Sequence, residues 1–388
     1  MRKAKDNEGV RNRYYRPTIT ACPHCGAPLC RRWTLWDKYL VTLEGRVHVF
    51  SVGYGCSRSR CSTRVYHSDE AEQLSPKGCS FGYDVIVQIG WWRFWDHRTL
   101  DEIAKLLSER QLPISRRHIL YLIGDFLALL RAAQPAKIKL QEAYFKRHGL
   151  VISVDGMQPE QGNEMLFVVR EANLDLTLAA ETLYSSRADL ISRHLIEPLK
   201  KLGFRIRAVI SDSAWIIELT HLFEPCDEHG VTRTARQVKR EVKQFLDRLE
   251  QEATQCPDTA KIIHNIVKAV RNRWWGLFTC YRVSHVPSSN NDLETFFNDM
   301  KHHQRRITGR KTVQEFILRY GPFAAFIDYA ETFDDLLARL PQVQPEDFKQ
   351  ARQAMQKVQT RLKKLYRFRH HPVDFFRDLE IQWRVAVS

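Results

Sequence analysis

The stretch GLVISVDG at residues 149–156 decides the fold, because it is an apolar β-strand that closes on the carboxylate of Asp155. Further apolar or alternating stretches predict a strand, a strand, an amphipathic helix and a strand, at 164–170, 176–184, 187–202 and 204–210. The last of these strands runs into Asp212. This order predicts a mixed α/β core with an antiparallel meander, in which Asp155 and Asp212 follow two strands.

Two carboxylates at neighbouring strand ends predict a cation site. Side by side, Asp155 and Asp212 would repel each other unless a positive charge lies between them. Oxygen ligands suit Mg²⁺ or Mn²⁺, and a third acid would complete a two-metal site for phosphoryl transfer. Simpler readings stay open: Asp155 as a turn residue before Gly156, and Asp212 as the cap of a following helix.

The third acid is expected in the segment 287–311. A helix start at Pro287 is followed by Glu294, and the packing stripe of this helix is Leu293, Phe296, Phe297 and Met300. Five basic residues and no acid occupy 301–311, namely Lys301, Arg305, Arg306, Arg310 and Lys311. A carboxylate on a helix that continues into cations fits a metal ligand beside a phosphate track. Glu294 could instead belong to a helix cap, and Asp292 is its nearest competitor.

The motifs VISVDG, AVISDS and NNDLETFFNDMKHHQRRITGRK together resemble the DDE-type insertion-sequence transposases, over residues of about 150–325. The resemblance implies a ribonuclease H-like catalytic core with Asp155, Asp212 and Glu294 as the catalytic triad. It also implies two Mg²⁺ (or Mn²⁺) ions per active site, cleavage of DNA ends and attack of a 3′-hydroxyl on target DNA. Such a protein binds the terminal inverted repeats of its element and works as a homodimer or higher oligomer on DNA.

One departure is the distance of 82 residues between Asp212 and Glu294. We predict a helical insertion at about 226–275 within it. Cys226 and His229 have the spacing of a Cys-x-x-His element, although their position close behind Asp212 also fits an accidental match. Trp275 could stack on a DNA base, or the Trp274–Trp275 pair could pack in a core.

Cysteine spacing predicts a metal centre near the N-terminus. Cys22 and Cys25 form one knuckle, Cys56 and Cys61 form a second, and a predicted β-hairpin separates them. Four thiolates suit one structural Zn²⁺, which indicates a zinc ribbon-like module. His24 and Cys30 are spare candidate ligands, and two pairs of buried thiols without metal are the alternative.

The segment 98–132 predicts two helices separated by Leu112-Pro113-Ile114 and resembles a helix-turn-helix. In that reading Arg116, Arg117 and His118 lie at the exposed start of the recognition helix, where base contacts are made. An ordinary helical hairpin remains open. The aromatic run 91–95 is expected to pack in a core.

Composition agrees with a polyanionic partner, because the 388 residues carry a net charge of +15. The most apolar run, Tyr121–Leu130, contains Asp125 and is too short to span a membrane. We therefore expect a soluble, cytoplasmic, nucleoid-associated protein without a membrane partner. Residues 355–370 carry six Lys or Arg and no acid, which fits a phosphate-binding helix, a subunit contact or a packed helix with a basic outer face.

The expected organisation is a multidomain α/β protein. It comprises a basic disordered arm at 1–16, a zinc-binding β module at 17–80, a helix-turn-helix domain at 81–140, a catalytic core at 141–330 and a helical C-terminal segment at 331–388. We expect a DNA transposase that performs Mg²⁺-dependent end cleavage and strand transfer. The alternatives are a catalytically inactive, domesticated DNA-binding regulator and a structure-specific DNA nuclease.

Overall fold

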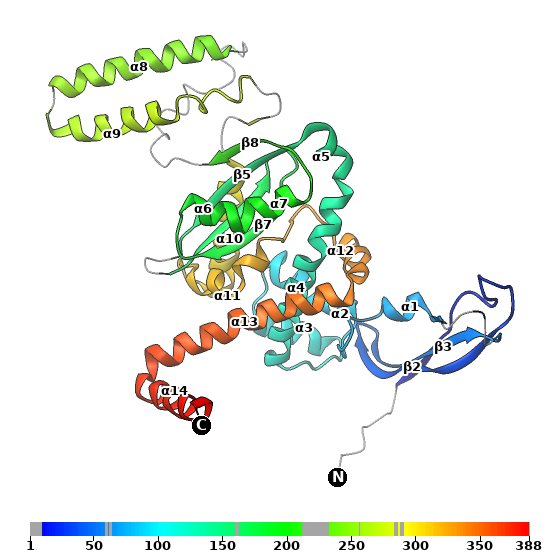
Figure 1. Cartoon of the computed structure of the whole chain (residues 1–388). Helices are drawn as coiled ribbons and strands as arrows, with labels where there is room; N and C mark the ends of the chain where they lie inside the picture. The colour runs from blue at the N-terminus through cyan, green and yellow to red at the C-terminus, as the bar shows by residue number, and fades with distance from the viewer. Residues whose placement is uncertain are drawn as a thin grey trace. The chain divides into compact units, whose positions relative to one another are not determined.

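A computed structural model describes residues 10–58, 61, 64–159, 163–211, 233–255, 257–282, 286–287 and 291–387. The protein is mixed α/β with two mixed sheets (Figure 1). It forms two compact units, described separately below. The first unit comprises Met1–Lys137, His303–Lys311 and Leu318–Ser388, and the second comprises Ile138–His302 and Thr312–Ile317. Residues 303–311 and 318–330 of the expected 141–330 core therefore group with the first unit.

The first sheet belongs to the first unit and has the order β1-β3-β2, with β4 also paired to β3. Its strands are β1 (Arg11–Tyr15), β2 (Leu29–Thr42), β3 (Gly45–Cys56) and β4 (Val65–Tyr66). β2 and β3 form the predicted antiparallel hairpin, and its tight turn is permitted by Gly45, which has a φ of 115°.

Strand β1 corrects one prediction, because residues 11–15 were expected in a disordered arm. They pair in parallel with β3 from Arg11↔Val47 to Tyr15↔Ser51. The ring of Tyr14 stacks on Phe50 with 4.9 Å between centroids, and Tyr15 packs against the small core of the sheet. These long-range aromatic contacts hold a segment whose own composition is charged.

The first unit also contains several helices, of which α4 is the most deeply buried. They are α1 (Asp69–Glu72), α2 (Tyr83–Phe94), α3 (Leu100–Glu109), α4 (Arg116–Leu140), α12 (Phe333–Arg339), the 3-10 turn Leu340–Gln342, α13 (Pro345–His370) and α14 (Pro372–Val387). The first unit includes α4 only as far as Lys137. The predicted apolar stripe of α4 is buried, as Ile119, Leu122, Ile123, Phe126, Leu127 and Leu130. Trp92 and Phe94 of α2 are buried too, which confirms core packing for the aromatic run.

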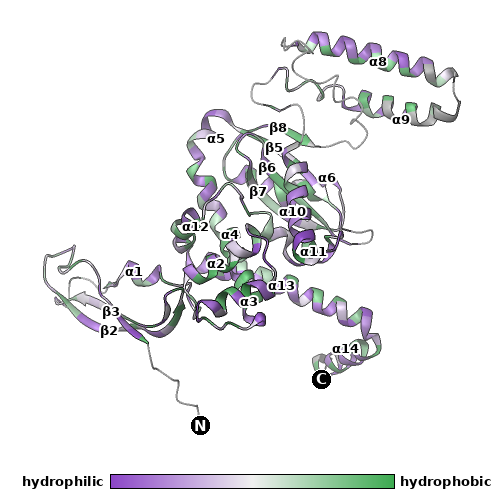
Figure 2. Cartoon of the chain, turned by 180° about the vertical axis from the view of Figure 1, so that it is seen from behind, coloured by the Kyte–Doolittle hydropathy of each residue, from purple (hydrophilic) through white to green (hydrophobic). Residues whose placement is uncertain are grey.

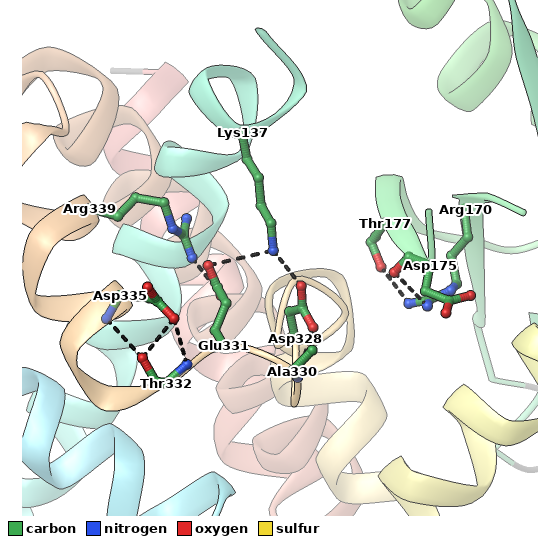
Figure 3. A network of polar contacts seen from close by, with 10 residues as sticks. All are labelled: Lys137, Arg170, Asp175, Thr177, Asp328, Ala330, Glu331, Thr332, Asp335 and Arg339. Atoms are coloured by element: carbon green, nitrogen blue, oxygen red, sulfur yellow. Dashed lines mark hydrogen bonds and ion pairs between the residues drawn. The ribbon is translucent and has the colours of Figure 1, made fainter. Parts of the chain in front are cut away.

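Helix α4 runs to Leu140, well beyond the predicted end. Among the described residues it is the one helix long and apolar enough to cross a membrane by length and composition, and 67% of its apolar window is buried inside the protein. That burial is the behaviour of a core helix. Near its end, Lys137 Nζ lies 2.5 Å from Asp328 and 3.5 Å from Glu331, and Glu331 also pairs with Arg339 of α12 (Figure 3).

The second unit is built on the sheet β7-β6-β5-β8. Its strands are β5 (Leu150–Met157), β6 (Met165–Glu171), β7 (Leu176–Leu183) and β8 (Ile206–Ser211), and all four were predicted within two residues. β5, β6 and β7 form the predicted antiparallel meander, whereas β8 runs parallel to β5. Figure 2 shows these strands largely in the hydrophobic colour.

Helical segments complete the second unit. The predicted helix between β7 and β8 consists of α6 (Ala188–Ile191), a π-helical turn (Ser192–Ile196) and α7 (Glu197–Lys201). The other helices are α5 (Glu142–His148), α8 (Ala235–Gln255) and α9 (Pro257–Arg273). The first residues of α10 (Asn291–Thr308) and of α11 (Gln314–Ala324) also belong to this unit. Leu195 and Leu199 pack against the sheet face that carries Ile152 and Val154. α8 and α9 form the predicted helical insertion and share a small core of their own.

Candidate functional site

The four predicted cysteines converge in the first unit. The Sγ atoms of Cys22, Cys25, Cys56 and Cys61 all lie within 4.8 Å of one another, with Cys22–Cys61 at 3.8 Å and Cys25–Cys56 at 3.5 Å. A tetrahedral Zn²⁺ with bonds of about 2.3 Å requires edges of about 3.8 Å between its sulfur ligands. The group could therefore hold a metal such as zinc.

Local backbone geometry forms the first knuckle. The Gly26 amide donates to the Cys22 carbonyl at 2.9 Å, and Gly26 has a φ of 68° that closes the turn. A backbone hydrogen bond from His24 lowers the pKa of the Cys22 thiol to about 6. The hydrogen bond with Cys25 and burial raise the pKa of Cys61 to about 12. Four thiols so close together do not all ionise without a cation.

The spare ligands suggested by the sequence lie elsewhere. His24 and Cys30 are both exposed, and neither belongs to the cysteine group. The imperfect spacing of the second knuckle, with four residues between Cys56 and Cys61, is thus no obstacle to convergence.

Asp155 lies within β5, opposite Val168 of β6. It is half-buried, and its Oδ1 accepts the Gly156 amide at 2.7 Å. Because β5 continues to Met157, the reading of Asp155 as a turn residue is wrong. Its neighbour Val154 pairs with Ser211, the last residue of β8. Asp212 lies outside the described residues, as do Cys226 and His229.

Glu294 lies in the first turn of α10, and it is exposed. The stripe beneath it is buried as predicted, at Leu293, Phe296, Phe297 and Met300. Asp292, the competing acid, is instead bound to Arg170: the Arg170 Nε donates to Asp292 Oδ2 at 2.7 Å. That contact gives Asp292 a structural partner and leaves Glu294 as the exposed acid of this turn.

Arg170 connects the start of α10 to the second sheet. Its side chain is 9% exposed, and it also donates to Thr177 Oγ1 at 3.2 Å and to the Asp175 carbonyl at 2.6 Å (Figure 3). The guanidinium lies 4.9 Å from the centre of the Phe296 ring. The sheet and α10 therefore share one buried cation with several partners.

The register of β5 and β6 decides on which face this connection lies. Ser153 is opposite Arg170, and Asp155 is opposite Val168. Directly opposed residues of an antiparallel pair point to the same face, and so do residues two apart along one strand. Asp155 and Arg170 thus point to the same face, and Asp292 fastens the first turn of α10 over it.

The five basic side chains of the predicted segment after Glu294 are exposed, namely Lys301, Arg305, Arg306, Arg310 and Lys311. His303 on the same helix is buried instead. It is 1% exposed, and its Nδ1 lies 2.9 Å from His97 Nδ1, with the Phe94 ring 5.0 Å away. This histidine packs in the first unit.

The predicted recognition positions are at the start of α4. Arg116, Arg117 and His118 are exposed, and the Ser115 hydroxyl accepts the His118 amide at 3.3 Å as the expected cap. Arg116 pairs with the exposed Asp101 at 3.1 Å, and Arg117 donates to Tyr121 Oη at 3.1 Å. The preceding helix α3 begins with a capping box between Thr99 and Glu102.

The two tryptophans near the insertion differ in environment. Trp274 packs edge-on against Phe278 with 5.0 Å between ring centroids, as expected for a core residue. Trp275 is 81% exposed, so the core-packing alternative is wrong for it.

Sequence reasoning missed Arg170 as the anchor of α10. The signal was available, because an arginine within the apolar run LFVVRE is rarely buried without a partner. The chain was compared with models of known protein families, with curated proteins and with solved structures, and no match was found in any of the three.

Proposed function

We propose that this protein is a DDE-type DNA transposase. It would bind the terminal inverted repeats of its element, cleave the DNA ends and join them to target DNA. The observation that carries the proposal is the Arg170–Asp292 ion pair, which fastens the first turn of α10 over the sheet face that bears Asp155. Glu294 is in that same turn and is exposed, so the ion pair attaches the helix end that carries Glu294 to the sheet that carries Asp155.

Strand pairing supports the third acid. Val154 of β5 pairs with Ser211 of the parallel strand β8. Asp155 and Asp212 directly follow these two residues in the sequence. The sheet order β7-β6-β5-β8, with an antiparallel meander and a parallel fourth strand after a helical crossover, supports the proposal of a ribonuclease H-like core. In this proposal the second unit is the catalytic core, and α8 and α9 are its insertion.

Asp155, Asp212 and Glu294 would hold two Mg²⁺ or Mn²⁺ ions, since all three offer hard oxygen ligands. When bound, such ions supply an activated nucleophile and stabilise the leaving oxygen in phosphoryl transfer. The chain's own part is to hold the acids on rigid elements: Asp155 in a buried strand, its Oδ1 oriented by the Gly156 amide, and Glu294 on an anchored helix.

The first unit would recognise DNA. The cysteine group would bind one structural Zn²⁺ in a zinc ribbon-like module, and α3 and α4 would act as a helix-turn-helix. Arg116, Arg117 and His118 would contact base edges, and Trp275 of the second unit would stack on a DNA base. The exposed cations after Glu294 would follow the phosphates.

The test uses the zinc-loaded full chain and end-labelled duplexes that cover the DNA on each side of its reading frame, with a supercoiled plasmid as target. We expect Mg²⁺-dependent cleavage at one position per flank and joined products. Both should disappear in Asp155→Asn and Glu294→Gln while DNA binding persists. Glu197→Gln on α7 is the matched control, because it removes an exposed carboxylate of the same unit whose helix packs on the opposite sheet face.

The rival functions predict other products. A regulator with an inactive core would bind the flanking DNA and cut none of it. A structure-specific nuclease would cut and yield no joined DNA. Equal activity of Asp155→Asn and Glu197→Gln would overturn the catalytic assignment altogether.

A further inference from the structure

Helix α13 divides into a packed half and an exposed half. Phe348, Ala351 and Met355 of its first half are buried, at 3%, 8% and 3% exposure. Arg352 Nε donates to Asp125 Oδ1 at 2.6 Å, and Asp125 is itself 6% exposed. A buried apolar stripe and an ion pair with the buried Asp125 therefore anchor the base of α13 within the first unit.

The opposite side of α13 carries an open groove, which we call the α13 groove. It is lined by Gln353, Gln356, Lys357, Thr360, Arg361 and Lys364. At about 100° per residue, these positions centre on the side of the helix roughly opposite Phe348, Ala351 and Met355. The groove is therefore turned away from the surface that anchors the helix.

The chemistry of the α13 groove fits phosphate oxygens. All six lining side chains donate hydrogen bonds, none is a carboxylate and none is a large apolar residue. Among the described residues, neither Lys357 nor Lys364 is paired with a carboxylate, whereas Lys349 earlier on the same helix pairs with Glu346 at 3.8 Å. The stretch 355–370 has six Lys or Arg and no acid, although Arg367 pairs with Asp378 of α14 at 2.6 Å.

The dimensions also match a nucleic-acid backbone. The positions from Lys357 to Lys364 span about 10 Å along the helix axis, which equals the rise of about three nucleotides along one DNA strand. Duplex DNA carries one negative charge per about 1.7 Å of its axis, so several phosphates come within reach of this row.

We infer that the α13 groove is a DNA-backbone binding site, separate from the helix-turn-helix and the cationic segment after Glu294. This inference rests on the proposed function in one respect only, the choice of DNA as the polyanion. Lys357 and Lys364 contact phosphates without reading sequence, and the anchored base of α13 keeps them in register with the rest of the first unit.

The test is the double variant Lys357→Gln/Lys364→Gln of the full chain, with a 30-base-pair duplex of mixed sequence as probe and fluorescence anisotropy over a range of salt. Each phosphate contact contributes about 0.9 to the slope of log affinity against log salt. We expect the slope to fall by about 1.8, and the affinity at roughly 0.1 M salt to fall at least tenfold.

The matched control is Lys146→Gln/Lys349→Gln, which removes the same net charge. Both control lysines already pair with an acid, Lys146 with Glu142 at 2.5 Å and Lys349 with Glu346. Equal slopes for the two double variants would overturn the inference. So would a loss of self-association in Lys357→Gln/Lys364→Gln with unchanged DNA affinity, because the groove would then face a second copy of the chain.

The outcome is separable from that of the proposed function. A reduced slope in a protein that cuts no DNA would keep the α13 groove and refute the transposase. An unchanged slope in a protein that cleaves and joins DNA would do the reverse.

Discussion

Arg170 of β6 and Asp292 of α10 are 122 residues apart in the chain, yet their side chains meet at 2.7 Å. The arginine is almost fully buried, whereas the aspartate keeps about a fifth of its surface exposed. Their contact fastens the first turn of α10, which carries Glu294, to the sheet that carries Asp155. The proposed site depends on this attachment.

Removing the cation should loosen the attachment. Arg170→Met leaves Asp292 without its buried partner, which costs about 3 kcal/mol for a pair of this kind. The double variant Arg170→Met/Asp292→Asn should recover part of the loss, because no charge is left uncompensated. Urea unfolding of the three proteins measures both effects. A single variant as stable as the parent would show that the ion pair does not hold α10.

The cysteine group should bind one metal ion per chain. Elemental analysis should detect zinc in the parent protein and none in Cys61→Ser. Without the metal the β1–β4 sheet should unfold, because so small a module buries little core. Cys30→Ser is the control, because Cys30 is exposed and stands outside the group. Full zinc content in Cys61→Ser would contradict the site.

The capping box of α3 should give a stability term that depends on pH. The backbone of Thr99 donates to the Glu102 carboxylate and lowers its pKa below the ordinary 4.5. A depressed carboxyl pKa stabilises the fold above the ordinary value, and this stability is lost as pH falls through the folded value. Glu102→Gln should therefore lower the melting temperature near neutral pH, and lower it less in acid. A thermal melt series at several pH values checks it, and a deficit that grows in acid would contradict it.

The start of α4 should carry sequence preference. Arg116→Ala and Arg117→Ala should each lose about 1–3 kcal/mol of discrimination between the flanking DNA and a scrambled duplex. Arg147→Ala, an exposed arginine in the last turn of α5, should leave that ratio unchanged. If all three variants lose affinity equally for both duplexes, Arg116 and Arg117 contact only phosphates.

Local patterning was sufficient for the second sheet. The strands β5 to β8 are apolar runs bounded by polar residues, so the periodicity alone predicted their order and, within two residues, their ends. The stripe of α10 was equally readable, because Leu293, Phe296, Phe297 and Met300 follow helical spacing. In both cases the information lies within a single element.

Long-range contacts were beyond such reasoning. Strand β1 is charged and short, and its contacts are with a distant part of the chain: it pairs with β3, and Tyr14 stacks on Phe50. Helix α4 continues through Pro135 to Leu140 because Ala133, Gln134 and Ile138 are buried around it. An arginine within the apolar strand β6 predicts a buried hydrogen-bonding partner, but the sequence does not identify that partner as Asp292.

The most direct test of the proposed site is localised cleavage of the polypeptide by Fe²⁺ and ascorbate, performed on the zinc-loaded chain. Radicals formed at a bound ion cut only nearby backbone. The account predicts cuts close to Asp155, Asp212 and Glu294 in one reaction, suppressed by excess Mg²⁺ and absent in Asp155→Asn. Cuts confined to one of these three regions, or cuts that persist unchanged in Asp155→Asn, would contradict it.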